Sequence, residues 1–286
     1  ELRNVRAFAM LSPWIDVGSV GSGTLDFIET RFNAVEIGKL SRPGLFYDFT
    51  RYRPMLSHVG GQRVVKIPNT VINYARGEGD TDYVFLRFLE PHAMGDIFAS
   101  SALRVLERLG VQSYCLLGGM YDSVPHTRPL VITGSASGSG WQARLKEAGI
   151  NGSGYEGPTT INILVSDGAA ERGIEVMTLV AHLPHYAQLE DDYSGHYNML
   201  KLLNDLYGIP LDLGNVKRMG EEQYGRVSRA VELDPEAREL VRVMEKNYDE
   251  GMEQTGPPDV MSHLSPEIER YLREMEKRLD TEDGAS

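Results

Sequence analysis

Three apolar segments of this chain each end in a Pro-His dipeptide, at His92, His126 and His185. Proline fixes its own φ at about −65° and has no N–H group, so regular strand pairing stops there and a rigid turn begins. The segments before these turns are apolar without strict alternation, which is typical of strands covered on both faces. Three buried strands that each end at a Pro-His turn therefore predict a sheet that is covered on both faces.

Helical spacing of apolar residues separates the expected strands. We expect strands at residues 5–11, 34–40, 83–89, 112–117, 130–133 and 175–182, and helices near residues 25–32, 93–109 and 139–148. Residues 158–172 fit either element, because a β-branched start favours a strand whereas Ile161, Val165 and Ala169 share one helical face. We expect a helix there, since the strand that follows needs a crossover before it.

Residues 45–75 follow a different pattern from the rest of the chain. The stretch LFYDF, the glycine pair Gly60-Gly61 and the stretch RVVKIP predict antiparallel strands joined by a hairpin. Elsewhere strands and helices alternate, which indicates an α/β fold with a mostly parallel sheet flanked by helices. Right-handed crossovers would place all the strand carboxyl ends, and with them the three Pro-His turns, along one edge of the sheet.

The chain is expected to be helical after residue 193. One helical face carries four apolar side chains and stops at Gly208; these are Met199, Leu202, Leu203 and Leu206. Two more helices follow, the second with Asp234 as its N-cap residue and Pro235 at its first helical position. We therefore divide the chain into an α/β core domain, residues 1–210, and a C-terminal helical extension, residues 211–286.

The end of the extension carries a second helical pattern. Residues 256–258, Gly-Pro-Pro, indicate a linker, and Ser265 would cap a last helix. That helix would carry a narrow apolar stripe of Ile268, Leu272, Met275 and Leu279. A helix of this length is not stable alone, so we expect it to dock on the body or on a neighbouring subunit.

Charge and composition exclude several classes of protein. The formal net charge of −12 leaves no basic face for a nucleic acid and disfavours an anionic membrane. No apolar run reaches the roughly 18 residues of a membrane span and no signal peptide is readable, so a cytoplasmic protein is expected. The single cysteine, Cys115, excludes an intramolecular disulfide and a cysteine-based zinc site, and its apolar neighbours predict a buried core residue.

The glycine-rich stretch GSVGSG, residues 18–23, lies between an expected strand and an expected helix. Its backbone N–H groups could bind a phosphate, or its small residues could serve tight packing between strand and helix. It matches neither the dinucleotide-binding pattern nor a Walker sequence. We take Gly21 and the nearby Asp16 as ligand-binding candidates.

The polar residues around the Pro-His turns form the strongest candidate site. Asp122, His126 and Arg128 lie in one turn, and the other candidates are His92, Tyr155, Glu156 and His185. A histidine, a carboxylate and an arginine at one sheet edge could supply general acid–base chemistry and an anion clamp. The same groups could equally form a hydrogen-bonded network that fixes the geometry of the turns.

Metal and serine chemistry have little support. His182 and His185 are three residues apart, so on an extended strand they point to opposite faces. The glycines around Ser135 and Ser137 are spaced too widely for a nucleophile elbow. We therefore expect no metal and no cofactor, and we assign no catalytic residue.

Several stretches together resemble the proteasome-assembly-chaperone family of the second-chaperone type. They are VPHTRPLVITGSAS, YEGPT and AHLPHY, with SPWIDVGSVGSGTLDFI, FYDFTRYRP and EPH also consistent, over about residues 6–225. The resemblance implies an α/β fold similar to nucleoside phosphorylases and a homo-oligomer such as a trimer. The long acidic helical tail is similar to that of bacterial members, whose role is generally unassigned.

The resemblance also guides the functional expectation. Eukaryotic and some archaeal members act as non-enzymatic chaperones of proteasome ring assembly, and they can dock through a C-terminal hydrophobic-Tyr-any motif. The residues Asp283-Gly284-Ala285-Ser286 do not match that motif, so docking of that kind is not expected. We expect a non-enzymatic, oligomeric protein-binding factor whose partners are other copies of itself and another protein complex. The alternative is a small-molecule-binding protein or enzyme with its site at the strand carboxyl ends.

Overall fold

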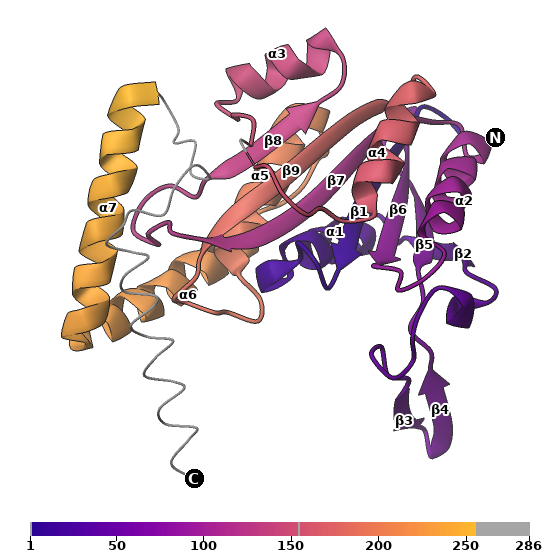
Figure 1. Ribbon diagram of the computed structural model, residues 1–286, viewed down its shortest axis with the longest axis horizontal. Helices are drawn as coiled ribbons and strands as arrows, with labels where there is room; N and C mark the ends of the chain where they lie inside the picture. The colour runs from indigo at the N-terminus through magenta and orange to yellow at the C-terminus, as the bar shows by residue number, and fades with distance from the viewer. Residues whose placement is uncertain (1, 154, 256–286) are drawn as a thin grey trace.

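Seven strands form one sheet in the order β2-β5-β6-β1-β7-β9-β8 (Figure 1). The computed structural model describes residues 2–153 and 155–255. The strands are β1 (Val5–Ser12), β2 (Val35–Lys39), β5 (Val71–Arg76), β6 (Asp82–Leu89), β7 (Val111–Asp122), β8 (Ile132–Ala136) and β9 (Glu175–Pro184). The four central strands β6, β1, β7 and β9 run parallel.

Strand β1 shows why both faces of the sheet are covered. Phe8 and Met10 belong to the apolar core on one face, and Ala7, Ala9 and Leu11 to the core on the other. Because side chains alternate along a strand, a run that is apolar at every position buries both of its faces. The α/β fold class expected from these runs is confirmed.

Helices form a layer on each side of the sheet (Figure 1). Helices α2 (Gly95–Arg108) and α4 (Asn162–Glu171) cover one face, and α1 (Val20–Arg31) and α5 (Tyr193–Tyr207) cover the other. Helix α3 (Ser139–Glu147) packs beside β8. The helix chosen over a strand for residues 158–172 is confirmed as α4. The apolar face predicted for α5 is also confirmed, because its four side chains are all buried.

Two strands, β5 and β8, run against the others, so the sheet is mixed although most of its strands are parallel. Strand β5 runs antiparallel to β6, and β8 runs antiparallel to β9. The connections at residues 77–81 and 123–131 are short, whereas a chain that enters its next strand in the same direction needs a crossover of roughly a dozen residues or more. β6 therefore reverses the direction of β5, and β8 reverses that of β7. The expectation that all strand carboxyl ends share one edge was therefore wrong for β5 and β8.

Two local expectations also differ from the structure. Strand β7 continues to Asp122 rather than ending at residue 117, so the start of the candidate turn is itself paired with β9. The stretch LFYDF is not a strand: the 3-10 helix η2 (Pro43–Leu45) ends at its first residue, and Phe46 packs edge-on against Phe98 of α2. The proline at the start of η2 and the burial of Phe46 favour this compact turn.

The C-terminal helices are α6 (Gly214–Leu233) and α7 (Pro235–Thr255). The Asp234 side chain accepts hydrogen bonds from the backbone N–H groups of Glu236 and Ala237, at 2.9 and 3.3 Å, which confirms the predicted cap. The linker at 256–258 and the last helix lie outside the described residues. Among the helices described, none has the length and apolar character needed to cross a lipid bilayer.

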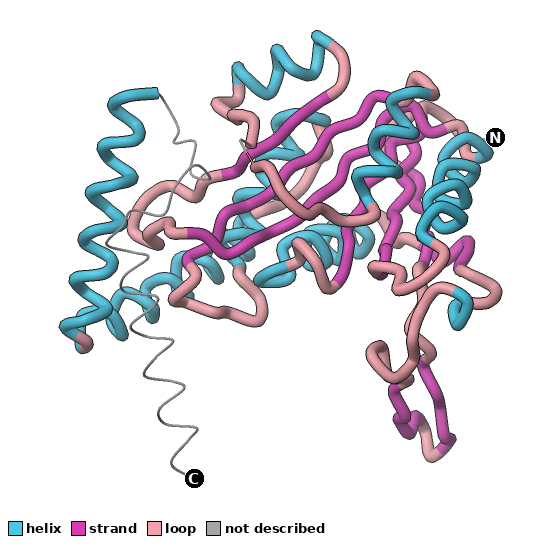
Figure 2. The backbone as a smooth tube through the Cα atoms, viewed as in Figure 1, coloured by secondary structure: helices cyan, strands magenta, loops and turns pink. Residues whose placement is uncertain are grey.

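A separate hairpin projects from the body (Figure 2). It consists of β3 (Met55–Val59) and β4 (Gln62–Lys66), joined at Gly60 and Gly61, which both have positive φ. Glycine adopts that conformation without strain, so this pair suits the tight turn. The hairpin predicted between residues 45 and 75 is confirmed with these bounds.

Candidate functional site at the strand carboxyl ends

The three Pro-His turns lie at the carboxyl ends of β6, β7 and β9, on the same edge of the sheet. They do not form one cluster, because β1 lies between β6 and β7. His126 and His185 follow neighbouring strands, whereas His92 belongs to a separate group of side chains. The candidates therefore divide into two groups that the sequence could not distinguish.

A hydrogen-bonded chain of three side chains, two of them buried, joins β7, β8 and β9. The His182 ring lies 2.7 Å through Nδ1 from Asp122 Oδ2 and 2.8 Å through Nε2 from the Thr133 hydroxyl. A carboxylate only accepts, so His182 donates from Nδ1 and accepts the hydroxyl proton of Thr133 at Nε2. His182 is fully buried and Thr133 nearly so. The order of groups is that of a hydroxyl–histidine–carboxylate triad, but it lies inside the protein and links three strands.

His126 is the centre of a second hydrogen-bonded chain. Its Nδ1 lies 2.6 Å from the Tyr186 hydroxyl, and its Nε2 lies 2.9 Å from the Ser228 hydroxyl on α6. Ser228 donates its own proton to the Tyr224 carbonyl, so it accepts from Nε2 and leaves Nδ1 to accept from Tyr186. Both ring nitrogens are thereby satisfied in the neutral tautomer. Burial lowers the pKa of His126 and outweighs the opposing charge of Glu245.

This burial makes the stability of the fold dependent on pH. Folded His126 resists protonation while the unfolded chain takes up a proton near pH 6.5, so the unfolded state binds more protons at low pH. The contribution of His126 is present above about pH 6.5 and is lost as pH falls toward its lowered folded value. We expect the urea concentration at the unfolding midpoint to decrease as pH is lowered from 8 to 5. The decrease should be smaller in His126→Gln than in the wild-type protein. An equal decrease in both would contradict a neutral, buried His126.

Arg128 joins the same turn to α7. Its guanidinium forms two hydrogen bonds of 2.8 Å to the Asp249 carboxylate and one of 3.1 Å to Glu245. This pairing raises the pKa of Arg128 and lowers that of Asp249. The Tyr248 hydroxyl donates to the Pro129 carbonyl at 3.1 Å beside it. The group proposed as an anion clamp thus binds carboxylates of the protein itself.

His185 lies against the end of β7 rather than in an open position. Its backbone N–H donates to the Asp122 carbonyl at 3.2 Å, and its Nδ1 lies 3.1 Å from the same oxygen. Its ring packs edge-on against Tyr186. Asp122 and His185 therefore contact each other at this edge, while His126 and Arg128 join the turn after β7 to the C-terminal helices.

His92 belongs to the other group, at the end of β6. Its Nδ1 accepts from the Asp48 backbone N–H at 3.0 Å, and its ring lies 4.5 Å from that of Tyr52. The neighbouring Glu90 carboxylate accepts from the Ile161 N–H at the start of α4, at 3.0 Å, and its pKa is raised by burial. These contacts hold the segment before the hairpin and the start of α4 to the sheet.

The Asp16 carboxylate binds one of the backbone N–H groups of residues 18–23 that the sequence offered as phosphate ligands. Its carboxylate accepts from the Ser22 N–H at 2.9 Å in the first turn of α1, which begins at Val20. A side chain at Gly21 would approach the Leu117 carbonyl to 2.8 Å, so the glycine permits close packing of α1 on β7. Burial raises the pKa of Asp16 despite its hydrogen bonds with Ser22. The interpretation as tight packing describes this stretch.

A third cluster at the same edge carried no recognisable motif. Asp192 caps α5 by accepting from the Gly195 N–H at 2.8 Å, and it accepts the Tyr224 hydroxyl of α6 at 3.0 Å. The buried His196 ring lies 3.0 Å through Nε2 from the Gly18 carbonyl. An aspartate at a helix start is an ordinary cap signal, which could have identified Asp192, but its partner on α6 had no sequence signal.

Tyr155 and Glu156 lie in the exposed connection between α3 and α4. The Tyr155 hydroxyl donates to the Pro158 carbonyl at 2.8 Å, within the same loop. Cys115 is buried as predicted, and burial raises its pKa to about 12. Within the described residues, no group of three or more His, Cys, Asp or Glu side chains is arranged to hold a metal ion.

The fold and the contacts at the strand ends define the class of this protein. It is an α/β protein with a mixed seven-stranded sheet, and the turns at its strand ends form hydrogen bonds to its C-terminal helices. The model of the PAC2 family matches residues 10–231, so the chain belongs to the PAC2 family. The resemblance to proteasome-assembly chaperones expected from the sequence is confirmed. No curated protein matches the chain.

Solved structures share this fold. A PAC2 family protein from Streptomyces avermitilis has 25% sequence identity and a TM-score of 0.74, over 83% of this chain and 99% of that chain. A proteasome-assembly chaperone homologue from Mycobacterium tuberculosis has 24% identity and a TM-score of 0.74 over the same shares. The Pyrococcus furiosus protein PbaB, an archaeal proteasome activator, has 13% identity and a TM-score of 0.61, over 81% of this chain and 95% of that chain.

Proposed function

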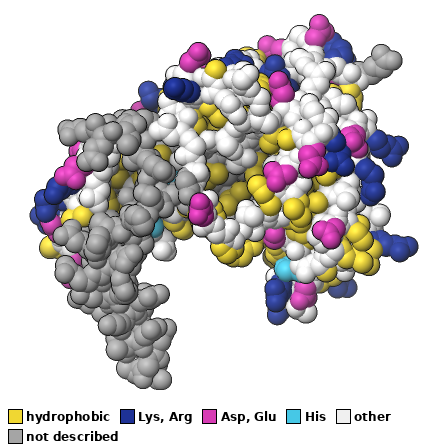
Figure 3. Space-filling model, turned by 45° about the horizontal axis from the view of Figure 1, so that its top comes forward, with side chains coloured by type: hydrophobic (Ala, Val, Ile, Leu, Met, Phe, Trp, Pro, Cys, Tyr) yellow, Lys and Arg dark blue, Asp and Glu magenta, His cyan; other side chains and the backbone are white. Residues whose placement is uncertain are grey.

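We propose that this protein is a non-enzymatic assembly factor of the cytoplasm that forms a homo-oligomer and binds another protein complex. One surface carries the proposal, the apolar end, defined as the exposed apolar side chains of residues 35–67. They are Val35, Ile37, Leu45, Met55, Leu56, Val59, Val64, Val65 and Ile67. Figure 3 shows exposed hydrophobic side chains with Lys and Arg beside them.

The concentration of these side chains is the physical reason for a protein partner. Eighteen large apolar side chains are exposed in the described residues, and half of them lie in this one segment of the chain. Single exposed apolar residues are normal on any protein, whereas a cluster at one end marks a binding surface. Strand β2 also lies at the sheet edge. Among the described strands it pairs with β5 alone, which leaves backbone groups for another chain.

The relatives indicate the kind of partner. Two of the structural relatives named above are described as a proteasome-assembly chaperone homologue and a proteasome activator. We therefore propose proteasome subunits as the partner complex. The alternative, a small-molecule site at the strand ends, has no observation in its favour, because Asp122, His126 and Arg128 are all bonded to groups of the protein.

Reconstituted proteasome assembly tests this function. We expect the purified protein to co-elute with proteasome subunits of its own organism in size-exclusion chromatography and to accelerate ring formation on native gels. Ile37→Lys, which puts a charge in the apolar end, should weaken subunit binding roughly tenfold or more. Leu233→Lys is the matched control, because Leu233 is exposed at the end of α6, outside the apolar end. Unchanged assembly in the presence of the wild-type protein would overturn the proposal.

A further inference from the structure

Among residues 2–153 and 155–255, no helix or strand covers the β3–β4 hairpin. All ten residues of its two strands are exposed, and the pair forms a sheet of its own. A two-stranded hairpin is at best marginally stable alone in water. Figure 1 shows it projecting from the body beyond β5 and β6. Burial against another protein surface would therefore stabilise the hairpin.

Both faces of the hairpin carry apolar side chains. Cross-strand pairing puts Leu56 opposite Val65 on one face, while Met55, Val59 and Val64 lie on the other. A flat partner surface would cover only one of these faces. A groove with two walls would cover both, so the hairpin has the form of an insert.

The charge of the hairpin segment indicates the charge expected on the surface of its partner. Residues 49–76 contain no Asp or Glu and five cationic residues, Arg51, Arg53, Arg63, Lys66 and Arg76, in a chain of net charge −12. Two hairpins facing each other across a two-fold axis would place like charges together. An acidic surface elsewhere on another copy avoids this repulsion.

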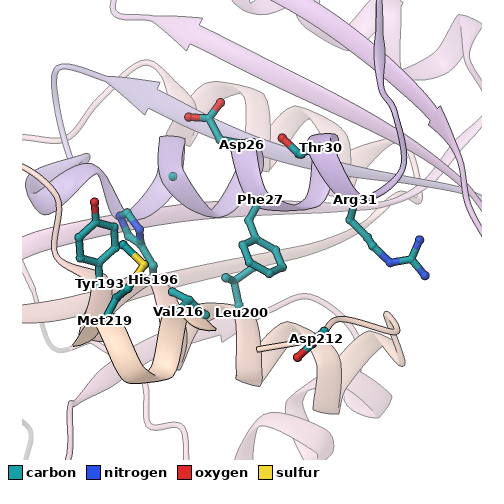
Figure 4. Close-up of a pocket in the computed structure, with 11 residues that line it drawn as sticks. Asp26, Phe27, Thr30, Arg31, Tyr193, His196, Leu200, Asp212, Val216 and Met219 are labelled. Atoms are coloured by element: carbon teal, nitrogen blue, oxygen red, sulfur yellow. The ribbon is translucent and has the colours of Figure 1, made fainter. Parts of the chain in front are cut away.

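The chain has a groove that fits these requirements (Figure 4). A cavity of about 470 Å³ lies between α1 on one side and α5 and α6 on the other, with Phe27, Leu200, Val216 and Met219 among its lining. Asp26 of α1, which pairs with Arg87 at 2.6 Å, and Asp212 before α6 also line it. Its one arginine, Arg31, is already paired with Glu78 at 2.8 Å.

We propose that the hairpin of one copy inserts into the α1–α5–α6 groove of a second copy. This inference rests on the proposed oligomeric function and names its interface. Hairpin and groove are different surfaces, so the contact is heterologous and each copy uses both. Repeated around an axis, such contacts close into a ring rather than a two-fold dimer.

A complementation experiment tests the interface by light scattering. Leu56→Asp alters only the hairpin, and Met219→Glu alters only the groove. We expect each variant alone to have the mass of a single chain, and their equimolar mixture to form a complex of two chains. The intact groove of the first variant then takes the intact hairpin of the second. Leu233→Glu, outside both surfaces, should keep the mass of the wild-type assembly, and circular dichroism should show that all variants are folded.

The outcomes separate this interface from the proposed function. If either single variant keeps the wild-type mass, or if the mixture stays monomeric, the hairpin–groove contact is wrong while self-association by another surface stands. A wild-type chain that is itself monomeric would contradict both the contact and the homo-oligomer. Proteasome assembly measured with Met219→Glu, which lies outside the apolar end, reports on the partner complex independently of the hairpin.

Discussion

Replacing His182 with alanine is expected to lower the free energy of unfolding by about 3–5 kcal/mol. The fully buried ring links Asp122 at 2.7 Å to Thr133 at 2.8 Å, across three strands. Its removal leaves a carboxylate and a hydroxyl without their partner and opens a cavity, and both effects destabilise the folded state. Urea unfolding followed by circular dichroism measures the change.

His185→Ala is the matched control for this prediction. His185 lies three residues further along the same edge and is partly exposed, and its ring lies beside a backbone carbonyl and Tyr186. We expect a loss of about 1 kcal/mol or less there. Similar losses for the two variants would show that His182 does not have the central role given to it.

Asp192→Ala is expected to lower the free energy of unfolding by about 2–4 kcal/mol. The loss of the α5 cap accounts for about 1 kcal/mol, and the remainder comes from the Tyr224 hydroxyl, which loses its carboxylate partner. Because Asp192 joins the start of α5 to α6, hydrogen exchange should also increase at the facing turns of both helices. A change below about 0.5 kcal/mol would contradict this role.

Asp192→Asn separates the hydrogen bonds from the charge. The amide oxygen can still accept from Gly195, so the loss should be much smaller than for alanine. Burial raises the pKa of Asp192 above 3.8 despite the hydrogen bonds from Gly195 and Tyr224. The stability that this pKa shift contributes is therefore fully present below about pH 3.8, and it declines as pH rises through the raised pKa of folded Asp192. We expect the asparagine variant to lose this part of the pH dependence.

The sequence predicted elements whose signals are local. The apolar face of α5 and the Asp234 cap of α7 depend on side chains within a few residues of each other, and the structure confirms both. The strand of residues 112–117 was predicted too short. Its last residues, Met120 to Asp122, are polar or flanked by glycine, and only pairing with β9 makes them a strand.

The candidate site was predictable as a set of residues and not as an arrangement. Asp122, His126, Arg128 and His185 do lie together, because they follow neighbouring parallel strands. His92 follows the same kind of strand and lies apart from them, since β1 takes the position between. Strand order depends on how the whole chain packs, and no local pattern records it.

The sequence by itself determined the layers of this protein: unbroken apolar strands require cover on both faces, and Pro-His turns end three of them at one edge. Only the tertiary structure decided what those turns contact. His126 meets Ser228, 102 positions away, and Arg128 meets Asp249, 121 positions away. Periodicity reports which side chains a segment must bury. The partner of a polar group depends on the packing of distant helices, which is settled by the free energy of the complete fold.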